Sequence, residues 1–206
     1  MIPPNSDHGP TLYIIGGCNG AGKTTASFTV LPDLLNCYEF VNADEIAKGL
    51  SPFRPESVAI EAGRLMLHRI EELMNQRVDF AFETTLAASL HLRTIAKAQA
   101  LGYRVHLLFF WLESVELAQQ RVQSRVKEGG HWISSEVIAR RYRNGLIRLM
   151  DDYLPMVDHA LIFNNSQGRY VLIAEKETGH GLITFDRFVF KQLTSSYEQF
   201  RHESGN

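Results

Sequence analysis

One run of eight residues constrains the fold of this chain more than any other feature. Residues 17–24 read G-C-N-G-A-G-K-T and match the pattern G-x-x-x-x-G-K-[ST] in full. The glycines of such a loop let backbone N–H groups turn inward around a polyanion, and the following helix adds its positive N-terminal end. An apolar run at residues 12–15 precedes the motif, and a helix-compatible segment at 26–30 follows it. The pattern therefore predicts a strand, a phosphate-binding loop and a helix in succession.

Two polar residues at the end of this loop have expected chemical roles. Lys23 can reach the β- and γ-phosphates of a nucleoside triphosphate, and the Thr24 hydroxyl can hold Mg²⁺. ATP and Mg²⁺ are therefore the expected cofactors, and the choice between ATP and GTP stays open. The alternative is a glycine-rich turn with a solvated lysine. The expected nucleotide-binding residues are Gly17, Asn19, Gly20, Ala21, Gly22, Lys23, Thr24 and Thr25.

Apolar runs alternate with helical patterns along most of the chain. Short apolar runs between helices are typical of buried parallel strands. The pattern predicts an α/β fold: a doubly wound, mostly parallel five-stranded sheet of P-loop kinase type, followed by a C-terminal hairpin and helix. The expected strands lie at 12–15, 38–41, 80–82, 105–112 and 159–163, the hairpin at 170–185 and the closing helix at 188–200. We expect one domain over 1–206, with a core at about 12–166, a lid at about 114–150 and a C-terminal extension at 167–206.

Composition narrows the class of protein and its compartment. The net charge is −2 with His neutral, which argues against a nucleic-acid-binding protein. Two cysteines make no disulfide framework and favour a reducing compartment. Residues 1–10 have no signal-peptide pattern, and the longest apolar stretch, 107–112, is far shorter than the ~20 residues that span a bilayer. We therefore expect a soluble, cytoplasmic protein with no membrane partner.

Two carboxylates follow expected strands and should lie at the sheet edge where ligands bind. Asp44 can accept the proton of an acceptor hydroxyl or orient it, and the alternative is that Asp44 only caps the next helix. Glu83 can hold a Mg²⁺-bound water or, with Thr84, a substrate hydroxyl. Its alternative role is a solvated strand end. From position alone, a functional role and a capping role are equally supported for Asp44, whereas a functional role is favoured for Glu83.

Basic residues concentrate between residues 114 and 150, where seven Lys and Arg face three Glu. Two arginine-bearing helices around Gly129-Gly130 resemble a lid that closes over phosphates, because arginine binds a phosphoryl group bidentately and is always charged. A solvated helix with surface arginines is the alternative. The candidate phosphate contacts are Arg121, Arg125, Arg140 and Arg141. His131, in the same region, is interpreted as a loop residue, and no zinc site is expected.

A reactive thiol is a further hypothesis. Cys18 lies inside the phosphate loop, next to a helix N-terminus and Lys23, which favours its thiolate. The alternative is that Cys18 is a small buried filler.

The ordered set of motifs resembles the zeta-toxin family of phosphate-loop kinases. The resemblance rests on G-C-N-G-A-G-K-T, F-V-N-A-D-E-I-A at 40–47, F-E-T-T-L-A at 82–87 and R-V-Q-S-R-V-K-E-G-G-H at 121–131, and it covers about residues 12–166. It implies ATP- and Mg²⁺-dependent phosphorylation of a small-molecule hydroxyl, with UDP-N-acetylglucosamine as the acceptor of the best-known members and an antitoxin as a protein partner.

The resemblance also implies roles for single residues. Lys23 and Thr24 match the nucleotide residues, Asp44 the catalytic carboxylate, Glu83 the substrate-side acid and Arg121 the first phosphate arginine. The second arginine of the family has no clear counterpart, and Arg125, Arg140 or Arg141 can substitute. We therefore expect Asp44, Lys23 and Arg121 to be catalytic. The rival functions are a metabolic or antibiotic-modifying kinase on the same scaffold, and an ATPase or binding module without an acceptor.

Overall fold

The fold is built on a seven-stranded sheet, seen in a computed structural model that describes residues 9–130 and 132–205. From edge to edge the strands run β2-β3-β1-β4-β5-β6-β7. The first five pair in parallel, and the last two add antiparallel beyond β5. The strands are β1 Thr11–Gly17, β2 Phe40–Val41, β3 Phe80–Thr84, β4 Arg104–Trp111, β5 His159–Asn164, β6 Val171–Glu177 and β7 His180–Thr184.

The predicted α/β alternation and the parallel strands are confirmed, but the predicted strand count is wrong. The C-terminal hairpin does form, and its first strand pairs with β5 from Asn164↔Val171 to His159↔Glu177. The sheet therefore has seven strands in place of five. Pairing with β6 satisfies the backbone groups that β5 would otherwise expose at a sheet edge.

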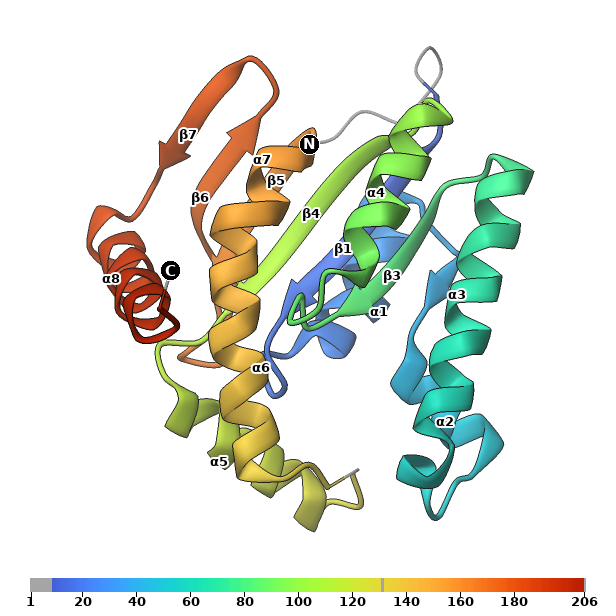
Figure 1. The fold of residues 1–206 in the computed structure, drawn as a ribbon, viewed down its shortest axis with the longest axis horizontal. Helices are drawn as coiled ribbons and strands as arrows, with labels where there is room; N and C mark the ends of the chain where they lie inside the picture. The colour runs from blue at the N-terminus through green and yellow to red at the C-terminus, as the bar shows by residue number, and fades with distance from the viewer. Residues whose placement is uncertain (1–8, 131, 206) are drawn as a thin grey trace.

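Helices lie on both faces of the sheet. Figure 1 shows α3, α4 and α6 in front of the strands and α1 behind them, while α8 contacts α6 and β6. This arrangement leaves the carboxyl ends of β1 and β3 facing the same space. The helices are α1 Lys23–Leu35, α2 Ala43–Leu50, α3 Ala59–Gln76, α4 Leu90–Ala100, α5 Val115–Lys127, α6 Ser135–Arg148, α7 Leu154–Met156 and α8 Arg187–Glu203, with short turns η1 Pro55–Val58 and η2 Leu149–Tyr153.

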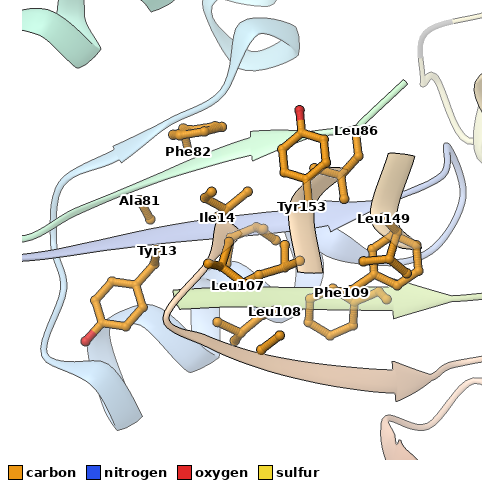
Figure 2. Packing of buried hydrophobic residues seen from close by; sticks show 14 of the residues in the cluster. Tyr13, Ile14, Ala81, Phe82, Leu86, Leu107, Leu108, Phe109, Leu149 and Tyr153 are labelled. Carbon is orange, nitrogen blue, oxygen red and sulfur yellow. The ribbon is translucent and has the colours of Figure 1, made fainter. Parts of the chain in front are cut away.

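The core packs against both faces because side chains alternate along the central strands. In Figure 2, Ile14 and Tyr13 point to opposite sides of β1, and Tyr153 lies on the same side as Ile14. Both Ile14 and Tyr153 are fully buried. The hydroxyl of Tyr153 donates to the carbonyl of Ala88 at 3.0 Å, so the segment after α6 is tied to the loop before α4.

Several helix boundaries follow from the capping residues that the sequence predicts. The sequence offers Ser114 as one N-cap and Ser134 or Ser135 as the next, and in the structure the side chains of Ser114 and Ser134 accept the backbone N–H groups of Leu117 and Val137. The alternative role of Asp44 as a helix cap is wrong, because α2 begins at Ala43 and its N-cap is Asn42, whose side chain accepts from the N–H of Asp44 at 2.8 Å. Asp44 is therefore free of a capping role.

No helix in the described part of the chain combines the length and hydropathy that crossing a bilayer requires.

Candidate functional site

The phosphate-binding loop connects the end of β1 to the start of α1, as the motif predicts. Lys23 is the first residue of α1, and its side chain is only 6% exposed. Its ammonium donates to the carbonyl of Cys18 at 3.0 Å and lies 3.4 Å from Glu83 Oε1. The lysine is thus folded back over its own loop and bridges it to the end of β3.

Glu83 connects the phosphate loop to the neighbouring strand. Its Oε2 accepts from the Thr24 hydroxyl at 2.7 Å and from the Asn42 side-chain amide at 2.9 Å, and the side chain is 10% exposed. β3 lies beside β1 in the sheet, so the carboxylate that ends β3 meets the first turn of α1. Glu83 therefore brings Lys23, Thr24 and Asn42 together in one network.

Asn42 extends this network to the second carboxylate. Its amide nitrogen donates to Glu83, while its oxygen accepts from the backbone of Asp44. One side chain thereby fixes the start of α2 relative to the end of β3. The Asp44 carboxylate makes no hydrogen bond or ion pair with another described residue, so it is available to a ligand.

These residues line one cleft of about 240 Å³. The phosphate loop, β3, α2 and α6 contribute its polar side chains, and α3 and α4 contribute a mostly apolar wall. The lining is Asn19, Lys23, Asn42, Ala43, Asp44, Gly63, Met66, Leu67, Glu83, Thr84, Thr85, Leu90, His91 and Arg141.

The four candidate arginines separate in the structure. Arg141 lines the cleft and donates to the Asn19 side chain at 3.3 Å, so it reaches the phosphate loop. Arg121 instead donates to the backbone carbonyls of Asn165 and Ser166, at 2.7 and 3.0 Å. Arg125 and Arg140 are exposed. Only Arg141 of these four lines the described cleft.

The helix that carries Arg141 is held against the core by contacts of its neighbouring residues. Tyr142 is buried and its hydroxyl donates to the carbonyl of Leu112 at 2.6 Å. A Cβ at Gly145 would lie 2.5 Å from the carbonyl oxygen of Thr85, so this glycine permits close approach to the segment after β3. Arg141 therefore projects from a fixed helix. His131, between α5 and α6, lies outside the described residues.

A second set of side chains supports the phosphate loop from the side of β5. The Asn165 amide donates to the carbonyl of Ala21, and the Tyr170 hydroxyl donates to the carbonyl of Gly22, both at 2.9 Å. Gly22 has φ of +82°, and a Cβ there would lie 2.7 Å from the Asn165 amide nitrogen. Arg121 in turn holds the backbone of Asn165. These contacts fix the conformation of the loop at Ala21 and Gly22.

We expect Tyr170→Phe to weaken nucleotide binding about 3- to 10-fold, because it removes one neutral hydrogen bond that supports the loop. Calorimetric titration with ATP measures the change. Tyr197→Phe is the matched control, since it removes a hydroxyl that bonds to Asp151 between α8 and the end of α6. Equal losses in both variants would contradict a specific role for Tyr170.

The hypothesis of a reactive Cys18 thiolate is wrong. Burial raises the pKa of the Cys18 thiol to about 11, and the nearby charge of Lys23 opposes this shift without reversing it. Cys18 is 6% exposed and belongs to the buried core cluster. The side chain is a buried filler beneath the loop, which the sequence had left as the alternative.

We expect neither cysteine of the folded protein to react with a thiol reagent at neutral pH. Cys37 is also buried, and burial raises the pKa of its thiol to about 12. Labelling with and without denaturant, followed by mass spectrometry, measures this. Modification of folded protein at Cys18 faster than at Cys37 would contradict the expectation.

A family model described as zeta toxin matches residues 3–178 of this sequence. The chain belongs to the zeta toxin family. The match contains the phosphate loop, both strand-end carboxylates and all four candidate arginines. An uncharacterized protein of Haemophilus influenzae is 32% identical over 127 residues, which are 61% of this chain and 88% of that protein.

Solved structures share the fold of this zeta toxin family member at low sequence identity. A chain from the complex AvrRxo1-ORF1:AvrRxo1-ORF2 with sulphate ions has a TM-score of 0.76 and 19% identity over 91% of this chain. The same complex with ATP has a TM-score of 0.74 and 18% identity over 92% of this chain. This chain spans 64% and 65% of those chains. A chain from the PezAT toxin-antitoxin system of Streptococcus pneumoniae has a TM-score of 0.67 and 16% identity, covering 98% of this chain and 90% of its own.

Asn42, Asn165 and Tyr170, which bond around the phosphate loop, were not predicted from the sequence, and neither was the wall that α3 and α4 contribute to the cleft. Asn42 carried a usable signal, since Asn before a helix is a preferred N-cap and caps at strand ends lie near the ligand edge. Asn165 and Tyr170 carried none, because their partners are backbone carbonyls more than 140 residues away in the sequence.

Proposed function

We propose that this chain is an ATP-dependent kinase that transfers the γ-phosphoryl group to a hydroxyl of a small molecule. The observation that carries the proposal is one cleft whose lining includes Lys23 and Arg141 together with Asp44 and Glu83. A phosphate-binding loop and an unpaired carboxylate in one cleft are what phosphoryl transfer to a hydroxyl requires. Family membership supports this reading.

Asp44 is assigned to the acceptor. Its carboxylate orients the acceptor hydroxyl and takes its proton while the new O–P bond forms and the bond from the γ-phosphorus to the leaving oxygen of ADP breaks. Lys23 and Arg141 offset the negative charge on the phosphoryl oxygens. Arg121 is assigned to positioning of the loop after β5. Arg125 and Arg140 are secondary candidates for contacts with the transferred phosphate.

The donor atoms at Thr24 and Glu83 fit Mg²⁺, which prefers oxygen ligands and usually keeps several waters beside one or two protein ligands. The two side chains already lie 2.7 Å apart, between the phosphate loop and the acceptor side of the cleft. The Thr24 hydroxyl would hold the ion directly and Glu83 would hold it through a water. Bound there, the ion supplies charge neutralisation at the β- and γ-phosphates.

The finer assignment of the acceptor is a UDP-amino-sugar such as UDP-N-acetylglucosamine. It rests on the family, as does the proposal of an antitoxin-like protein partner. Complexes of two proteins among the solved relatives support the partner, since one is named as a toxin-antitoxin system. We expect co-expression with a small protein encoded beside this chain to suppress its activity.

Acceptor-dependent ADP release tests the proposal. The purified chain is incubated with labelled ATP, Mg²⁺ and one acceptor at a time, including UDP-N-acetylglucosamine, free sugars and aminoglycosides. We expect one class of acceptor to stimulate ADP release and to carry the label. Label on an aminoglycoside or a metabolite alone would favour the rival kinase functions. Slow ADP release that no acceptor changes would favour an ATPase or binding module.

A further inference from the structure

The mostly apolar wall of the cleft contains one polar side chain whose role the proposed transfer chemistry does not use. His91, the second residue of α4, lines the cleft together with Asp44 and Glu83 and is 8% exposed. Its ring stacks on Phe82 of β3, with ring centroids 4.7 Å apart and planes inclined by 33°. Packing against β3 therefore places the imidazole in the wall of the cleft.

This imidazole has an unmet hydrogen-bonding capacity. Its Nδ1 is buried and has no hydrogen-bond partner within residues 9–130 and 132–205. Buried polar atoms in folded proteins are nearly always paired, because an unpaired one costs about 1–3 kcal/mol. Burial also lowers the pKa of His91 to about 4, so the ring is neutral at physiological pH and has one donor and one acceptor nitrogen. Nδ1 itself has almost no accessible surface, so a ligand in the cleft pairs with it once the imidazole ring turns toward the cleft that it lines.

The surroundings of His91 restrict the chemistry of that ligand. The two helices of this wall contribute no charged side chain to the cleft lining: α3 supplies Gly63, Met66 and Leu67, and α4 supplies Leu90 and His91. A charged group placed against such a wall would lose water without gaining an ion pair. An uncharged group with apolar surface beside it loses little water and gains a hydrogen bond.

We propose that His91 is a specificity-determining residue for the acceptor, and that it binds an uncharged hydrogen-bonding group, an amide or an alcohol with adjoining apolar surface, seated against Met66, Leu67 and Leu90. This inference rests on the proposed kinase function for calling the ligand an acceptor. The binding itself does not depend on phosphoryl transfer.

The chain offers a matched control for His91. His106 of β4 also has a buried Nδ1 without a partner among the described residues, and burial, followed by the nearby His159, lowers its pKa to about 4. It lines a different cavity, with Val30 of α1 and Leu161 of β5. Replacing His91 or His106 by Phe therefore removes the same chemistry from two separate places.

The experiment measures binding of two probes to protein loaded with a non-hydrolysable ATP analogue. The probes are N-acetylglucosamine, which is uncharged and carries an amide and a methyl group, and gluconate, which carries a carboxylate. Imidazole ¹⁵N signals, assigned from His91→Phe and His106→Phe, report the contact, and calorimetric titration reports the affinity for the probe and for the nucleotide analogue.

We expect N-acetylglucosamine to shift the His91 signals and not those of His106, and gluconate to shift neither. His91→Phe should weaken N-acetylglucosamine binding about 3- to 10-fold, the range for one neutral hydrogen bond, with unchanged affinity for the ATP analogue. His91→Asn, which keeps a polar atom near the position of Nδ1, should restore part of the loss. His106→Phe should bind the probe as the wild type does.

Three results would overturn the proposal: no shift at His91 with N-acetylglucosamine, equal weakening in the His91 and His106 variants, or gluconate binding at His91 as well as N-acetylglucosamine does. If the affinity for the probe depends on His91 but no acceptor is phosphorylated, the binding proposal holds and the kinase function is contradicted.

Discussion

Replacing Lys23 by alanine is expected to abolish phosphoryl transfer while the fold survives. The buried ammonium is the only cation within 4 Å of Glu83 in the described residues, and it emerges from the first turn of α1 toward the phosphate position. Loss of a single charge-stabilising donor at a reacting oxygen costs on the order of 10²–10³ in rate, and this lysine also contributes to nucleotide binding. Acceptor phosphorylation and ATP affinity, measured on the purified variant, should both fall.

The survival of the fold needs its own measurement, because Lys23→Ala leaves the carbonyl of Cys18 and one oxygen of Glu83 without a partner. Glu83 keeps the hydroxyl of Thr24 and the amide of Asn42, so we expect a cooperative thermal transition and only a modest loss of stability. Lys48→Ala is the matched control, since that lysine is exposed on α2 and pairs with Glu45 outside the cleft. Normal kinase activity in a folded Lys23→Ala variant would refute the assignment of the site.

Local sequence patterns predicted the parts of the fold that depend on neighbouring residues. The phosphate loop, the five parallel strands and the caps at Ser114 and Ser134 all follow from motifs, periodicity and capping preferences within short windows. The edge to which the C-terminal hairpin pairs does not follow, because an antiparallel hairpin of this composition can stand alone or extend a sheet. The pairing depends instead on the edge of β5, whose backbone groups are available to a further strand.

The candidate site likewise contains some features that the sequence predicts and others that it does not. Spacing places Asp44 and Glu83 at strand ends, and parallel strands bring them to one edge, so their proximity was predictable. The direction of a long side chain was not predictable: the sequence favoured Arg121 as the catalytic arginine, yet Arg121 holds backbone carbonyls after β5 and Arg141 reaches Asn19. Cys18 shows the same limit, because its burial outweighs the charge of Lys23 and only packing reveals it.

The network around Asn42 supports different proposed roles for the two carboxylates of the cleft. Glu83 is 10% exposed and accepts two hydrogen bonds, so its position is fixed by the protein. Asp44 is exposed and unpaired among the described residues, and only its backbone is held. A fixed carboxylate suits an ion or a bound water, while a free one suits a substrate hydroxyl whose proton must move.

Asp44→Asn separates these roles most directly. The substitution keeps size and removes the proton acceptor, so we expect transfer to the acceptor to fall about 10²–10⁴-fold, the range for a general base. The loss is smaller if the transition state is loose and Asp44 only orients the hydroxyl. ATP affinity and melting temperature should hold, because Asp44 does not cap α2 and its carboxylate makes no hydrogen bond or ion pair with the phosphate loop in the described residues. Glu45→Gln, next in the chain and paired with Lys48 outside the cleft, is the control and should transfer phosphate normally.

A collapse of nucleotide binding with preserved transfer per bound ATP would assign Asp44 to the Mg²⁺ site. Unchanged transfer would remove Asp44 from the mechanism and leave Glu83 as the carboxylate to test next.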